Sequence, residues 1–108
     1  MAGPSYSVVL IAAAGVEEAR LLADILLKER LAACINILPG VESRYWWQGG
    51  LETAPECLLF VKSRTSYLDA IIEKVKKAHS YQVPEIIALP ISGGNSDYLN
   101  WLGSETAK

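Results

Sequence analysis

The side chains best suited to bind a soft metal are few in this sequence: one histidine, His79, and two cysteines, Cys34 and Cys57. Imidazole and thiolate are the ligands that copper favours. The two cysteines form no Cys-x-x-Cys pair, and His79 is distant from both along the chain. A metal site therefore depends on the fold, or on a neighbouring subunit, to bring these ligands together.

Each of these residues also has a purely structural interpretation. Cys34 and Cys57 lie in apolar segments, where a thiol usually serves as a small buried core residue. His79 ends an apolar helical pattern, where an imidazolium is stabilised by the helix dipole and the ring reaches free carbonyls. As a metal ligand, His79 needs further donors, such as Glu85 or a group from another subunit.

Catalytic chemistry has little support in the residue inventory. The sequence offers no nucleophile–base pair and no phosphate-binding glycine loop. The glycine-rich stretch 92–95 follows a proline and opens only a short helix, so turn chemistry explains it. We expect that the protein is not an enzyme.

The composition indicates one folded domain over residues 1–108. Hydrophobic residues make up 51% and charged residues 20% of the chain, which is enough for a core and too little charge for a disordered chain. A net charge of -2 provides no basic field for nucleic acid or an anionic membrane. The first basic residue is Arg20, so the apolar run that starts at Val8 is predicted to be a buried strand rather than a signal peptide. We expect a cytoplasmic location.

Apolar periodicity predicts the order β-α-β-β-α-β followed by a short helix. Strands are expected over 6–13, 32–38 with a continuation over 41–48, 51–62, and 84–90, and the first helix over 16–30. Ser66 and Asp69 can form a capping box for the second helix, and Asn95 can cap the last one. This order is the α+β, ferredoxin-like arrangement, whose two helices cover one face of the sheet.

The hairpin between the second and third strands is longer than this fold needs. Residues 32–48 exceed twice the roughly six or seven residues of a core strand, and Gly49-Gly50 is a two-residue turn signal. The distal part must project as an arm, with Tyr45, Trp46 and Trp47 near its tip. We expect this arm to pair with a neighbouring subunit in a cyclic oligomer, because exposed aromatics and an unpaired edge favour a partner. The alternative is an arm folded back over the chain's own open sheet face.

The position of the turn also predicts how far apart the cysteines lie. With Gly49-Gly50 as the turn, Cys57 pairs near Glu42, and Cys34 lies about eight residues further along. At about 3.3 Å per residue this places the cysteines roughly 25 Å apart. A disulfide or shared metal site within one chain is then excluded, while contact across a subunit boundary stays open.

Several stretches, in order over nearly the whole chain, resemble the CutA divalent-cation tolerance family. They are Glu29–Asn36, Pro39-Gly40, Tyr45–Gly49, Lys62–Arg64, His79–Glu85, Ile87–Ile91 and Tyr98–Leu102. The resemblance implies a homotrimer of ferredoxin-like subunits, similar to the PII-type signalling trimers, with a role in tolerance of divalent metals, copper above all. The chain departs from the family pattern at Ala12, where some members carry a cysteine, and at Ala78, where some carry a second histidine.

Three hypotheses about function follow. The leading one is a trimeric metal-response protein that binds copper weakly, with His79 and Cys34 as the candidate ligands and copper or another divalent cation as the sole candidate cofactor. The alternative is a PII-like trimeric sensor or interaction protein. It would bind a small ligand or partner protein at intersubunit clefts that contain Lys62, Arg64, Tyr81 and Glu85. An ion-pair network that locks the trimer explains these four residues slightly better. The third hypothesis is a structural trimer that anchors other proteins.

Overall fold

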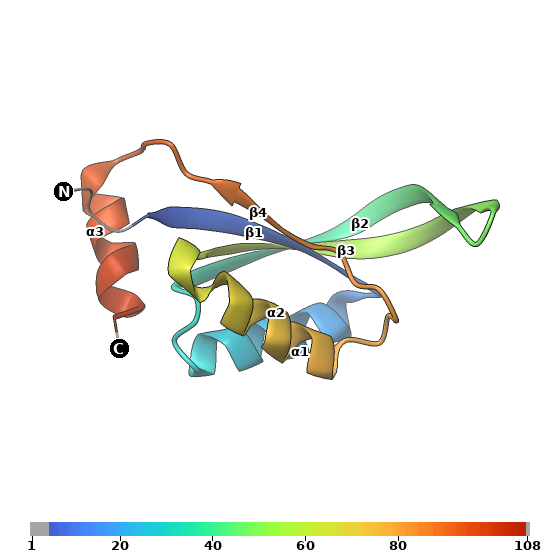
Figure 1. The fold of residues 1–108 in the computed structure, drawn as a ribbon, viewed down its shortest axis with the longest axis horizontal. Coiled ribbons are helices and arrows are strands. Elements are labelled where there is room, and N and C mark those ends of the chain that lie inside the picture. Colours follow the sequence, from blue (N-terminus) through green and yellow to red (C-terminus); the bar gives the residue numbers. More distant parts are fainter. Residues whose placement is uncertain (1–4, 108) are drawn as a thin grey trace.

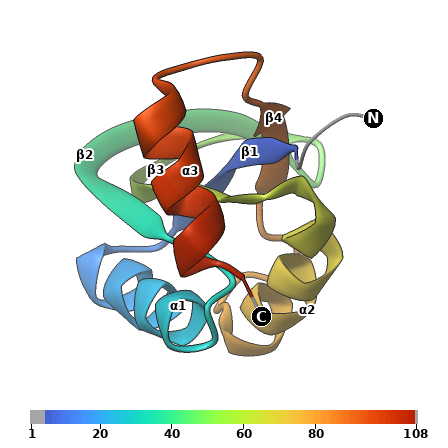
Figure 2. The ribbon, with the colours of Figure 1, turned by 90° about the vertical axis from the view of Figure 1, so that its left-hand side faces the viewer.

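The computed structural model describes residues 5–107. In chain order the elements are β1 (Tyr6–Ala13), α1 (Val16–Lys28), β2 (Cys34–Trp47), β3 (Gly50–Arg64), α2 (Leu68–Ala78), β4 (Ile86–Pro90) and α3 (Ser96–Glu105). The strands form one antiparallel sheet in the order β2-β3-β1-β4. Helices α1 and α2 lie side by side on one face of this sheet (Figures 1 and 2). The predicted ferredoxin-like fold is confirmed.

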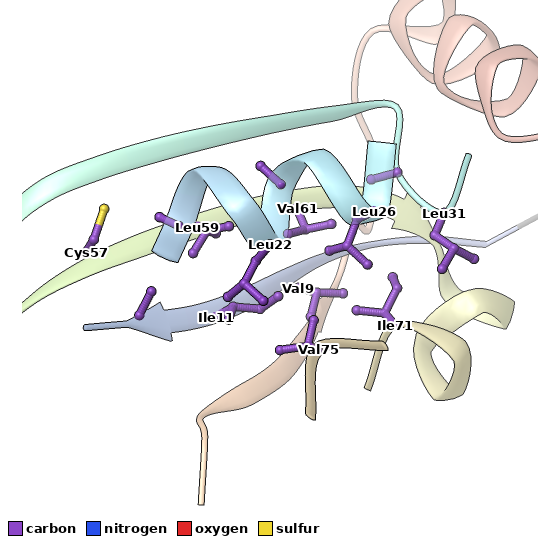
Figure 3. Packing of buried hydrophobic residues seen from close by; sticks show 14 residues of the cluster. Val9, Ile11, Leu22, Leu26, Leu31, Cys57, Leu59, Val61, Ile71 and Val75 are labelled. Atoms are coloured by element: carbon purple, nitrogen blue, oxygen red, sulfur yellow. The ribbon is translucent and has the colours of Figure 1, made fainter. Parts of the chain in front are cut away.

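The core fills the space between the sheet and the two helices (Figure 3). Alternate residues of β1 and β3 point to this side, and helical spacing supplies the facing residues of α1 and α2. Each large apolar side chain buried in this way contributes about 1.5–3 kcal/mol. The fully buried set includes Val9, Ile11, Leu22, Leu26, Leu59, Val61, Ile71 and Val75.

Helix α3 lies across the end of the sheet where β1 begins, far from the arm (Figure 1). The predicted cap of this helix is confirmed, because the Asn95 side chain accepts a hydrogen bond from the Asp97 backbone N–H at 2.9 Å. Among residues 5–107, none of the helices is long and apolar enough to span a membrane.

The predicted arm is present. Pairing between β2 and β3 continues to Trp47 opposite Gly50, and the molecule measures 47 × 26 × 23 Å, with the arm extending along its longest axis (Figure 1). A register shift between Leu38 and Val41 places a bulge at Pro39-Gly40, as the sequence predicted, and Gly40 has a left-handed φ of 76°.

The turn of the arm lies one residue earlier than predicted. Gln48 and Gly49 are its two central residues, with φ of 49° and 84°, so Gly50 already belongs to β3. This register and the bulge place Cys34 opposite Lys62, five residues along β3 from Cys57. At about 3.3 Å per residue the cysteines are about 16 Å apart along the strands, not 25 Å. Both carry free thiols, so the conclusion that they form no disulfide stands.

Two helix boundaries also differ from prediction. Helix α1 ends at Lys28 because Arg30 adopts a left-handed φ of 57°. The Leu31 N–H then bonds the Leu26 carbonyl at 3.0 Å, which is a Schellman ending with arginine in the usual glycine position. Helix α2 begins at Leu68 after a 3-10 turn over Thr65–Tyr67. Ser66 lies inside that turn, so the predicted capping box is wrong.

Candidate functional site

A cavity of about 710 Å³ lies at the base of the arm. Its walls come from the β2–β3 hairpin and from the loop between α2 and β4, which lie at the same end of the sheet (Figure 1). The walls combine aromatic rings with carboxylates. The principal side chains are Tyr45, Trp46, Trp47, Glu56, Tyr81 and Glu85.

Strand register explains why these side chains converge. Glu56 pairs with Val41 just beyond the bulge, and Cys57 pairs with Ala13, the last residue of β1. The arm therefore leaves the body of the sheet at this point. Alternation along β2 then places Tyr45 and Trp47 on the same face of the hairpin as Glu56.

His79 holds the loop that closes the cavity. Its side chain is completely buried, and Nε2 lies 2.6 Å from the Ala12 carbonyl oxygen. Nδ1 accepts a hydrogen bond from the Tyr81 backbone N–H at 3.0 Å. The Ala12 carbonyl oxygen can only accept, so Nε2 is the donor of that bond. The ring therefore joins the end of β1 to the loop after α2.

Glu18 reaches the same loop from the first turn of α1. Its Oε1 lies 3.0 Å from His79 Nδ1, and its Oε2 accepts a hydrogen bond from Ser80 Oγ at 2.5 Å. The Ser80 hydroxyl is thus bonded to a carboxylate, not to the imidazole. Glu18 is an acidic residue in the first turn of α1, where a negative charge complements the helix dipole, and nothing in the sequence signals this long-range contact.

Tyr81 forms the wall of the cavity beside His79. The two rings are 4.8 Å apart between centroids and tilted by 49°. The Tyr81 hydroxyl donates to Glu56 Oε2 at 2.7 Å. Burial raises the pKa of Tyr81, and the bonded Glu56 carboxylate raises it further. The phenol is therefore a neutral hydrogen-bond donor at physiological pH. Sequence reasoning identified Tyr81 but missed Glu56.

The two predicted metal ligands lie apart within one subunit. His79 contacts Ala12, whereas Cys34 is opposite Lys62 towards the other end of the sheet. Both His79 ring nitrogens already have protein partners. Across residues 5–107, no three His, Cys, Asp or Glu side chains gather in a way that could hold a metal ion. The residues of one subunit do not fit a copper centre.

The four predicted cleft residues fall into two groups. Tyr81 and Glu85 both line the cavity. Lys62 instead bonds Asn36 Oδ1 on the neighbouring strand, and Arg64 donates to the Gly103 carbonyl at 2.7 Å, at the far end of β3. A single subunit therefore does not bring the four together, and their meeting across a subunit boundary stays a prediction.

The predicted interface aromatics are exposed on the arm. The exposed fraction is 72% for Trp46, 41% for Tyr45 and 38% for Trp47. A hairpin of two strands supplies little core of its own to cover them. Their role at a trimer interface is a prediction that the single chain leaves open.

Comparison of the sequence with known proteins gives matches to one protein family over nearly the whole chain. The family model for the CutA1 divalent ion tolerance protein matches residues 7–105. The divalent-cation tolerance protein CutA of Thermus thermophilus is 50% identical over 99 residues, which cover 92% of this chain and 96% of that protein. The chloroplastic protein CutA 1 of Oryza sativa is 52% identical over 92% of this chain, which spans only 56% of the rice protein.

Solved structures agree with this result. The crystal structure of CutA1 from Oryza sativa has a TM-score of 0.94 and 48% sequence identity, with 97% of this chain and 96% of that chain covered. The structure of the periplasmic divalent cation tolerance protein CutA from Archaeoglobus fulgidus has a TM-score of 0.92 and 37% identity, with 94% of this chain and 99% of that chain covered.

Proposed function

The chain belongs to the CutA1 divalent ion tolerance family, and on that premise we propose that it acts as a homotrimer in the cellular response to divalent cations. The family relationship supports a role in metal tolerance in general. The observation that supports the trimer is the arm, which carries exposed aromatic side chains away from the body of the subunit.

The open face of the sheet gives the trimer further support. Helices α1 and α2 cover only one face (Figure 1). The strand register places Leu38, Ile87 and Leu89 on the other face, each about half exposed. A specific interface buries about 800 Å² on each partner. An apolar sheet face that continues into an aromatic arm supplies a surface of that kind. Closure into a ring covers the face in every copy, whereas a single copy leaves it in water.

Copper specificity rests on the family resemblance and needs groups from a second subunit. We propose that any copper bound at His79 or Cys34 is held weakly, because His79 is buried and already bonded through both ring nitrogens. We also propose a non-enzymatic role, since the hydroxyl of Ser80, the residue that follows His79, is bonded to the Glu18 carboxylate. The cytoplasmic location stays a prediction, because related proteins carry chloroplastic and periplasmic names.

Two measurements test the proposal. Light scattering on the purified protein should give three times the chain mass of 11.8 kDa, and a double Trp46→Ser and Trp47→Ser variant should lower it. A monomeric wild type at micromolar concentration contradicts the trimer. In a bacterial strain whose own family member is deleted, expression of the chain should restore growth on copper, zinc or cadmium salts. Unchanged sensitivity to all three contradicts the role in tolerance.

Calorimetric titration with copper separates the finer alternatives. Loss of one weakly bound equivalent per subunit in His79→Ala supports copper binding at His79. Equal binding by His79→Ala and wild type contradicts it and favours the sensor hypothesis, in which the cavity at the base of the arm recognises another ligand.

A further inference from the structure

We propose that helix α3 is a gate over the Cys34 thiol: the helix detaches locally, while the rest of the subunit stays folded, and the sulfur becomes accessible. Access matters because a cysteine thiolate is both a ligand for soft metals and the form that reacts with electrophiles. The inference goes beyond the proposed role in metal response, and it holds whether or not Cys34 binds copper.

The N-terminal half of α3 lies over Cys34. This cysteine is the first residue of β2, at the end of the sheet that α3 crosses (Figures 1 and 2). Its thiol is hydrogen-bonded to the Tyr98 side chain, and the rings of Tyr98 and Trp101 are 5.5 Å apart between centroids. The thiol is free but only partly exposed. Detachment of α3 removes this cover.

Helix α3 stands apart from the main core. Among residues 5–107, the cluster of buried apolar side chains between the sheet and the other two helices includes none from α3. The large apolar side chain that α3 buries completely is that of Leu102, whereas Tyr98 and Trp101 are 40% and 42% exposed. Segments with few buried apolar contacts open at a lower free energy than the core does. Helix α3 can therefore detach without global unfolding.

The loop before α3 can serve as the hinge. Ile91 is still held to β1, because its N–H donates to the Tyr6 carbonyl at 2.9 Å. Residues 92–95 follow, and all four are exposed. A Cβ added at Gly93 would meet no atom within 4 Å, and the adjacent glycines 93 and 94 give the backbone wide conformational freedom. The helix can thus move relative to the sheet without disturbing β4.

Arg64 is the latch at the other end of the helix. Its guanidinium donates to the Gly103 carbonyl at 2.7 Å and to Thr106 Oγ1 at 3.0 Å. Bonds of this kind are exchanged for bonds to water when a segment opens, so they oppose opening only modestly, although a charged donor opposes it most. The Arg30–Glu105 ion pair also joins α3 to the body, but it is well exposed and contributes little.

The alkylation rate of Cys34 measures the opening. In a Cys57→Ala background, Cys34 is the only thiol of the chain. We expect Arg64→Met to raise its rate with iodoacetamide at pH 8 roughly tenfold, because a bond to a charged donor is lost from the closed state alone. Arg30→Met is the matched control and should change the rate less than about threefold. Removal of a positive charge by itself slows a thiol, so an increase reports opening. Equal rates in Arg64→Met and its parent overturn the gate.

Hydrogen exchange of the unmodified protein separates local detachment from global unfolding. Amides of α3 should exchange at a lower opening free energy than those of β1 and β3, with a weaker dependence on added urea. The same opening free energy and urea dependence in all three elements overturns the inference, because α3 then opens only when the whole subunit unfolds.

Dilution separates the gate from dissociation of subunits. Detachment of α3 is unimolecular, so the alkylation rate of Cys34 should not depend on protein concentration. A rate that rises on dilution assigns the exposure to dissociation and overturns the gate. Light scattering on the same samples keeps the two proposals distinct: a monomer in which α3 opens locally contradicts only the trimer, and a trimer in which it does not contradicts only this inference.

Discussion

The Arg64 guanidinium lies 2.7 Å from the Gly103 carbonyl oxygen, although the two residues are 39 positions apart in the chain. The same guanidinium donates from Nε to Thr106 Oγ1 at 3.0 Å. Thr106 is fully buried, and its carbonyl accepts a hydrogen bond from the Tyr67 hydroxyl. These bonds fasten the end of α3 to the end of β3, so Arg64 has a structural role in the single subunit.

Substitution of Arg64 should therefore lower stability. Arg64→Met removes two hydrogen bonds from a charged donor and leaves the Gly103 carbonyl without this partner, so we expect the free energy of unfolding in urea to fall by about 2–3 kcal/mol. Arg30→Met is the control, because the Arg30–Glu105 ion pair is well exposed and should contribute less than about 1 kcal/mol. Equal losses in the two variants would contradict the anchoring role.

Gly103 should tolerate no larger side chain while Tyr6 keeps its hydroxyl. A Cβ at position 103 would collide with the Tyr6 hydroxyl oxygen. Gly103→Ala should lower the midpoint of thermal unfolding, because an overpacked contact typically costs about 1–3 kcal/mol, more than the roughly 1 kcal/mol that alanine adds to a helix. The double variant with Tyr6→Phe should recover most of the loss, since the next ring atom would lie 3.5 Å from the Cβ. A double variant no more stable than Gly103→Ala would show that the collision is not the cause.

Tyr81 should make the stability sensitive to alkaline pH. Burial and the Glu56 carboxylate raise the pKa of Tyr81 above its usual value of 10.0 in the folded protein. The unfolded chain therefore loses this proton first, and the stabilisation is complete below pH 10 and is lost as pH rises towards the folded pKa. The slope is at most about 1.4 kcal/mol per pH unit, reduced by solvent screening because Tyr81 is only partly buried.

Urea unfolding from pH 8 to 11.5 checks this expectation. The difference in unfolding free energy between wild type and Tyr81→Phe should stay constant up to about pH 10 and shrink above it. Tyr6→Phe, at the other end of β1 from the cavity, serves as the control. A constant difference through pH 11.5 would mean that Tyr81 titrates normally in the folded protein.

The Cys57 thiol should be unreactive in the folded protein. Burial raises the pKa of the Cys57 thiol, with the charge of Arg20 opposing it, and only 1% of the residue is exposed. In a Cys34→Ala variant, alkylation of Cys57 by iodoacetamide at pH 8 should be at least a hundredfold slower in buffer than in 8 M urea, because a thiolate must form and be reached. Comparable rates in the two solutions would indicate that the core opens near β1 and β3.

The order and type of the elements were predictable because they depend on local patterns. Alternation in 6–13 and helical spacing in 16–30 reflect burial on one side of each element. The turn of the arm was missed by one residue, because the glycine pair 49–50 is a strong signal while the structure uses Gln48 in a left-handed conformation. The capping box failed for a related reason: Ser66 matches the local motif, but the chain enters α2 through a 3-10 turn.

The candidate site was predictable only in part, because its geometry depends on contacts between distant segments. Tyr81 and Glu85 could be selected from one motif. Their partners could not: Glu56 comes from a strand whose register depends on the bulge, and Glu18 comes from the first turn of α1. The partners of Lys62 and Arg64 were also not predictable, although the two residues stand in one short motif. Lys62 bonds a neighbouring strand of the sheet, whereas Arg64 bonds α3.

The bulge at Pro39-Gly40 hinders the addition of further strands to the edge of the sheet, and so hinders aggregation. Strand β2 is an edge strand, so its outer backbone groups are a template for additional strands. Proline has no N–H to donate, and the bulge shifts the hydrogen-bond register between Leu38 and Val41. A strand of another molecule that pairs in register with one half of this edge is therefore out of register with the other half. The bulge protects a long exposed edge against cross-β aggregation while leaving each half free for a partner with a matching bend.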